Sequence, residues 1–146
     1  MKDLVRRYLA CSNDRDIQGM NALRAPGFLA HVPSQGSIGT SAPISAEVLN
    51  RDLLMISTAF PDLHNEIQEL VEEGDRVVVR GELSGTFKNA LGDVPPTGLR
   101  IAWDTVHLYR VENDLLAEAW FVTDTLSLLR QAGAVQVLAP APRSEG

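Results

Sequence analysis

The chain has 146 residues, 45% of them hydrophobic and 22% charged, with a formal net charge of −6. This length and composition predict one globular domain. The negative charge argues against nucleic acid, which proteins bind mainly by neutralising phosphates with Lys and Arg. We find no apolar run of signal-peptide length at the N-terminus and no stretch elsewhere that could span a membrane. We therefore expect a cytoplasmic protein with neither nucleic-acid nor membrane partners.

The first half of the chain predicts three helices, because apolar residues recur there at helical spacing. Pro26 and Pro61 end the second and third helices, and Ser45 is a good N-cap for the third. The expected elements are helices at residues 3–12 and 16–25, an extended segment at 27–32, a Pro/Gly/Ser loop at 33–43 and a helix at 46–60.

The second half predicts two β-hairpins and a last helix. Strands at 64–71 and 76–86 flank a turn with Gly74, and longer strands at 100–111 and 115–122 flank Asn113-Asp114, a pair that tolerates positive φ. Gly133 closes a helix at 125–132. Helices and strands segregated in this way indicate an α+β fold, in which three N-terminal helices pack on a curved antiparallel sheet. Residues 1–133 form the expected domain, and residues 134–146 a flexible tail.

The last hairpin is the predicted pocket wall. If Asn113 and Asp114 occupy the centre of the turn, His107 pairs with Trp120 and Trp103 with Asp124. His107 and Asp124 then lie about 13 Å apart on one face and act on opposite ends of a guest. The residues sharing that face are Trp103, Thr105, His107, Tyr109, Glu118, Trp120, Val122 and Asp124.

Several short motifs, in order, resemble the SnoaL-like polyketide cyclase family, of the superfamily named after nuclear transport factor two. They are Phe60-Pro61-Asp62-Leu63, the run from Glu72 to Arg80, Gly85-Thr86, Pro95-Pro96-Thr97-Gly98, and Glu118-x-Trp120-x-x-x-Asp124. The resemblance covers residues 4–133 and implies a cone-shaped α+β fold with a pocket. The chain departs from the family between Gly85 and Pro95, where members often carry His after Gly-Thr and then a Gly-Glu-Phe-like run, whereas this chain has the residues from Phe87 to Asp93.

The resemblance also implies an activity. Family members of known activity close a ring of an aromatic polyketide by intramolecular aldol condensation, without metal or cofactor. A carboxylate matching Asp124 acts as acid and base there, with histidines matching His107 and His31 nearby. We therefore expect a cofactor-independent acid–base enzyme with a hydrophobic carbonyl substrate and no metal. The expected substrate-binding residues are Trp103, Trp120, Tyr8, Asn50, Glu118 and Phe60.

Structural explanations stay open for each of these residues. Asp124 precedes a helix and could be only its N-cap, while His107 could be a satisfied core histidine. Glu118 could simply pair with a neighbour, and the two tryptophans could be packing residues. Two further functions also remain, namely a hydrolase or cofactor-free hydroxylase on the same scaffold, and a non-catalytic ligand-binding module.

The outer face of the same hairpin predicts self-association. Val106, Leu108 and Phe121 are expected to project from it, which makes the sheet apolar on both sides. Because such a surface requires a second cover, we expect a homodimer or higher homo-oligomer through this face.

Overall fold

Six strands form one sheet in the part of the chain that the computed structural model describes, residues 1–32, 42–136 and 138. The strand order is β2-β1-β6-β5-β4-β3. β1 runs parallel to β6, whereas all other neighbours are antiparallel, so the sheet is mixed and the expectation of a purely antiparallel sheet was wrong. The strands are β1 (Arg24–His31), β2 (Ile44–Ser45), β3 (His64–Glu73), β4 (Arg76–Thr86), β5 (Arg100–Glu112) and β6 (Leu115–Thr123).

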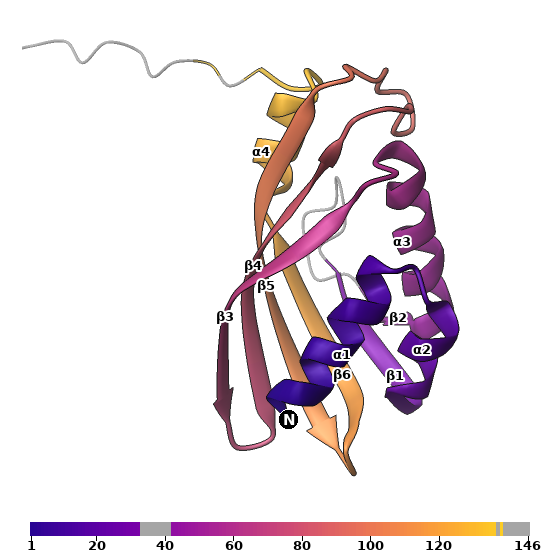
Figure 1. Ribbon diagram of the computed structural model, residues 1–146, viewed down its shortest axis with the longest axis vertical. Coiled ribbons are helices and arrows are strands. Elements are labelled where there is room, and N and C mark those ends of the chain that lie inside the picture. Colours follow the sequence, from indigo (N-terminus) through magenta and orange to yellow (C-terminus); the bar gives the residue numbers. More distant parts are fainter. Residues whose placement is uncertain (33–41, 137, 139–146) are drawn as a thin grey trace, which may run out of the picture.

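The first three helices lie on one side of the sheet, and a fourth packs at the end of the sheet opposite the hairpin turns (Figure 1). They are α1 (Lys2–Asn13), α2 (Ile17–Ala22), α3 (Ala46–Ala59) and α4 (Thr125–Gln131). α3 begins as predicted, because the Ser45 side chain accepts a hydrogen bond from the Val48 N–H. α2 is shorter than expected: Arg24 already pairs with Leu116 of β6, so the chain is extended where helix was predicted. No described helix is long and apolar enough to cross a membrane.

The two hairpins confirm the predicted strands. Asn113 and Asp114 both have positive φ, 50° and 60°, as expected for the centre of a tight hairpin turn. Strands β4 and β5 pair without interruption from Arg76↔Arg110 to Thr86↔Arg100, which makes them the regular centre of the sheet.

Two hydrophobic clusters hold the helices on the sheet. The first joins Leu4, Val5, Tyr8 and Leu9 of α1 to inward side chains of β4, β5 and β6. The second, at the α4 end, contains Phe60, Phe87, Ile101, Trp103 and Leu128. Of the expected loop and tail, residues 33–41, 137 and 139–146 lie outside the described part of the chain.

Candidate functional site

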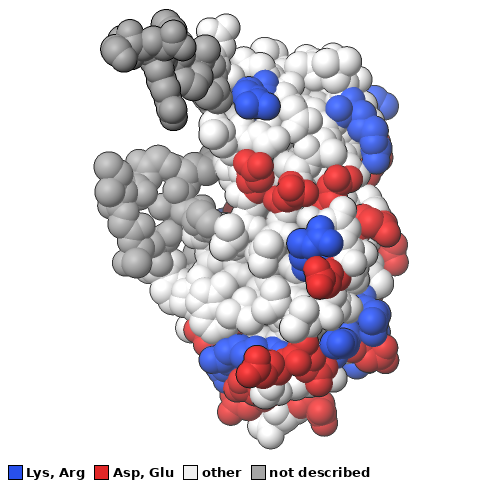
Figure 2. Space-filling view, turned by 90° about the vertical axis from the view of Figure 1, so that its left-hand side faces the viewer, with Lys and Arg blue, Asp and Glu red and all other residues white. Residues whose placement is uncertain are grey.

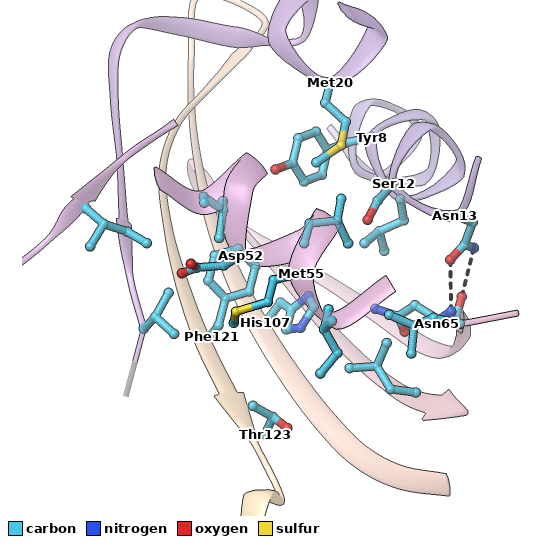
Figure 3. A pocket seen from close by; sticks show the side chains of 18 of the residues that line it. Tyr8, Ser12, Asn13, Met20, Asp52, Met55, Asn65, His107, Phe121 and Thr123 are labelled. Atoms are coloured by element: carbon cyan, nitrogen blue, oxygen red, sulfur yellow. Dashed lines mark hydrogen bonds between the residues drawn. The ribbon is translucent and has the colours of Figure 1, made fainter. Parts of the chain in front are cut away.

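An apolar cavity of about 540 Å³ lies between the helices and the inner face of the sheet (Figure 3). This volume is in the range of small-molecule sites in proteins. Both hydrophobic clusters contribute to its wall, which is mostly apolar. The polar or titratable residues that line it are Tyr8, Ser12, Asn13, Arg15, Asp52, Asn65, His107, Tyr109, Thr123 and Thr125.

Strand β5 supplies the centre of the sheet wall. Its residues alternate between buried and more exposed, so Trp103, Thr105, His107 and Tyr109 share the inner face, as predicted. Trp103, His107 and Tyr109 line the cavity directly. The expected pocket face of this strand is therefore correct.

Strand β6 presents the opposite face from the one predicted. Glu112 pairs with Leu115 as expected, but a bulge after Arg110 leaves Ala117 as an extra residue on β6. His107 consequently pairs with Phe121 rather than Trp120. Because side chains alternate along a strand, this one-residue shift exchanges the two faces of β6.

The exchange puts Phe121 and Thr123 on the cavity wall and Glu118, Trp120 and Val122 on the outer face. The predicted shared face of His107 and Asp124 was thus wrong. Thr123 has a buried hydroxyl without a hydrogen-bond partner among the described residues.

His107 lies in a chain of hydrogen bonds whose direction can be assigned. The Thr105 hydroxyl donates its one proton to the Val122 carbonyl (3.2 Å), so its oxygen accepts from His107 Nε2 (2.7 Å). His107 Nδ1 then carries the lone pair and accepts from the Tyr109 hydroxyl (3.1 Å). The proton on Nε2 and the acceptor at Nδ1 fix one neutral tautomer.

Burial keeps this histidine uncharged. Removal of the ring from water lowers the pKa of His107 from 6.5 to about 4. Burial also raises the pKa of Tyr109 well above its usual value, so the phenol retains its proton. At neutral pH the pair is an uncharged, fixed polar group in an apolar wall.

Asp52 is the one carboxylate among the described residues that line the cavity, and sequence reasoning missed it. It projects from α3 and has no hydrogen-bond or ion-pair partner within the described ranges. A signal was available, because Leu49, Leu53 and Ile56 form the apolar stripe of α3 and Asp52 falls on that stripe at helical spacing. An acidic residue on a core-facing stripe indicates a function beyond solubility.

Asp124 occupies the N-cap of α4 and does not line the cavity. Its carboxylate accepts a hydrogen bond from the Ser127 N–H (3.0 Å), and the residue is exposed. The capping explanation therefore accounts for its position. An additional catalytic role for Asp124 stays a prediction without support from this geometry.

His31, Glu118 and Trp120 form a cluster on the outer face, away from the cavity. His31 Nε2 lies 2.7 Å from Glu118 Oε1, and its ring stacks on Trp120 with centroids 4.9 Å apart. Arg110 also donates to Glu118 (3.2 Å), and the hydrogen bond from His31 is the main cause of the lowered pKa of Glu118. None of the three lines the cavity, so their expected roles there have no geometric support.

Of the remaining predicted residues, one lines the cavity and two are buried behind the residues that line it. Tyr8 lines the cavity as expected. Asn50 is buried behind it and accepts a hydrogen bond from Arg24 Nη1 (2.7 Å). Phe60 is fully buried and packs on Phe87 and Trp103, so it supports the wall without reaching the cavity. No three His, Cys, Asp or Glu side chains in the described chain converge as metal ligands would.

Comparisons with known proteins agree with this architecture. AclR from Streptomyces galilaeus, provisionally described as a hydroxylase, superposes with a TM-score of 0.82 at 25% identity, over 94% of this chain and 87% of its own. IdmH from Streptomyces antibioticus, provisionally described as a polyketide cyclase, gives 0.81 at 25% identity, over 90% and 97%. No curated protein matched the chain.

The sequence profile of SnoaL-like polyketide cyclases matches residues 2–132. This match covers nearly the whole described domain, from α1 through α4, and with it the whole cavity wall. The chain belongs to the SnoaL-like polyketide cyclase family.

Proposed function

We propose that this protein is a cofactor-independent enzyme that closes a ring in a hydrophobic, polyketide-like carbonyl compound by intramolecular aldol condensation. The observation that carries the proposal is the free Asp52 carboxylate in an apolar cavity whose facing wall holds an uncharged histidine. Family membership and the similarity to IdmH support this class of reaction.

In this mechanism Asp52 is both base and acid. It takes a proton from a carbon flanked by two carbonyls, and the C–H electron pair forms an enolate. The enolate carbon attacks another carbonyl of the same molecule, which forms the new C–C bond and an alkoxide. Asp52 then returns its proton to the alkoxide, which gives a β-hydroxy carbonyl compound isomeric with the substrate, and loss of one water from this compound completes the condensation. Holding both reacting groups in one cavity supplies much of the rate enhancement.

His107 forms part of the sheet wall against which the substrate is positioned in this proposal. Tyr109 is fully buried and holds the His107 ring in place through its hydrogen bond to Nδ1. Trp103 and Phe121 supply flat apolar surface for an aromatic substrate.

The test is ring closure of an aromatic polyketide that bears a β-keto ester side chain, followed by absorbance and mass spectrometry. We expect Asp52→Asn to lower kcat/KM at least about 100-fold, the usual contribution of a positioned acid–base group. Asp104→Asn removes the same charge from the exposed side of β5 and should leave kcat/KM unchanged. Equal activities of Asp52→Asn and the wild type would refute the assignment.

Cofactor-free hydroxylation is the second candidate, favoured by the similarity to AclR. The same cavity and base can form a substrate carbanion, whose electron pair adds to molecular oxygen to form a hydroperoxide. Loss of water from the hydroperoxide then leaves a carbonyl, the keto form of a phenol, which retains one oxygen atom of the O2. Reaction under oxygen-18 gas separates the two, because ring closure incorporates no label and hydroxylation does.

A further inference from the structure

Arg24 is a buried cation without a counter-charge. Its side chain is 6% exposed and forms no ion pair with any carboxylate in the described residues. The guanidinium lies over the rings of Tyr8 and Phe28, with its central carbon 5.2 and 4.9 Å from their centroids. Nη1 donates to Asn50 and Asn21. Burial of an unpaired charge is costly, so its position calls for an explanation beyond packing.

The other donors of Arg24 converge on one atom, the hydroxyl oxygen of Tyr8. Both Nε–H and Nη2–H donate to it. These two bonds occupy the acceptor capacity of the oxygen and leave the phenol proton to be donated elsewhere. No described residue accepts that proton. Burial raises the pKa of Tyr8 by more than Arg24 lowers it, so the proton stays on the oxygen.

The Tyr8 side chain lines the cavity and is only 2% exposed. In Figure 3 Tyr8 and Thr123 lie at opposite ends of the view, with His107, Asp52 and Phe121 between them. An unused O–H donor, polarised by a buried cation, therefore lies at the α1 end of the cavity.

We propose that Tyr8 donates this hydrogen bond to a guest oxygen that carries or develops negative charge, and that Arg24 is a positioning residue that strengthens the donor. The inference rests on the proposed function and deepens it, because it specifies an enolisable carbonyl whose oxygen lies at the α1 end. Charge-assisted donors in a site that excludes water are an effective way to stabilise such an oxyanion.

A purely structural role for Arg24 predicts something different. Arg24 does tie α1, α2, β1 and α3 together through Tyr8, Asn21 and Asn50. If Arg24 were only structural, its charge would be unnecessary, and the pKa of a bound ligand would not depend on Tyr8. A ligand whose protonated and deprotonated forms absorb at different wavelengths therefore distinguishes the structural role from the proposed one.

The test uses 7-hydroxycoumarin, whose phenol and phenolate forms absorb at different wavelengths, titrated with pH while bound to the full chain. We expect the wild type to favour the phenolate, so that the apparent pKa of the bound probe lies below its value in water. Tyr8→Phe should raise the bound probe's pKa by about one unit, the size of a lost hydrogen bond to a charged group. Arg24→Gln should raise it in the same direction.

Arg80→Gln is the matched control, because it removes an equal charge from an exposed arginine paired with Glu69, outside the cavity wall. It should leave the bound probe's pKa unchanged. The proposal is overturned if the wild type does not favour the phenolate, or if Tyr8→Phe binds the probe with an unaltered pKa. The effect of Tyr8→Phe should persist in Asp52→Asn, so failure here is distinguishable from failure of the proposed base.

Discussion

At the scale of single residues, the burial of His107 ties the stability of the fold to pH. The unfolded chain protonates this imidazole below about 6.5, whereas the folded protein resists protonation down to about 4. Between these values the unfolded state binds more protons, so stability rises with pH. The contribution of His107 is present in full above 6.5 and is lost as the pH falls toward 4.

We therefore expect the free energy of unfolding of the wild type to fall by roughly 3 kcal/mol more than that of His107→Gln between pH 7 and pH 4. Urea unfolding at several pH values measures both proteins. Comparing them removes the contributions of Glu118 and Asp62, whose lowered pKa values act in both. Parallel pH profiles would contradict a neutral buried His107.

At the scale of elements, the point at which β6 ends places Asp124 at the N-cap of α4. The strand ends at Thr123, and the next residue caps α4 with its carboxylate. Its carboxylate accepts the Ser127 N–H, and Asp124 does not line the cavity.

Replacement of Asp124 by alanine should lower the free energy of unfolding by about 1 kcal/mol, the usual cost of a lost N-cap. Asp124→Asn should unfold like the wild type, because asparagine caps equally well. Thermal and urea unfolding give these values. If Asp124→Asn folded normally yet lost turnover, Asp124 would regain the catalytic role that the family resemblance implies.

Most elements were predictable because their signals are local. Ser45 marks the start of α3, and Asn113-Asp114 fix the hairpin turn. The bulge at Ala117 was not predictable, since no glycine or other turn residue marks it and it depends on the pairing of two strands. The resulting one-residue shift moved Glu118 and Trp120 to the outer face, whereas Tyr8, Trp103 and His107 line the cavity.

At the scale of the whole molecule, the outer face of the sheet is the surface that we expect to mediate self-association. Figure 2 shows many charged side chains of both signs at the end with the hairpin turns, and further charged side chains among uncharged surface above them. Val106 and Val122 pair there and are 42% and 62% exposed. Phe121, which we had expected on this face, lines the cavity instead.

We still expect a homodimer or higher homo-oligomer through this face, because exposed apolar surface on a sheet favours self-association. Light scattering at micromolar concentration should give at least twice the chain mass. Val122→Arg should give a monomer, whereas Leu126→Arg, at an exposed position on α4, should not change the mass. A monomeric wild type would contradict the expectation.

The central claim, that Asp52 removes a proton from a carbonyl compound bound in this cavity, has a direct measurement. A hydrophobic 1,3-diketone that cannot cyclise is incubated with the protein in deuterated water, and loss of its activated C–H signal is followed by NMR. We expect the wild type and Asp104→Asn to accelerate exchange over buffer, and Asp52→Asn to lose nearly all of the acceleration. Exchange by Asp52→Asn at the wild-type rate would contradict the account.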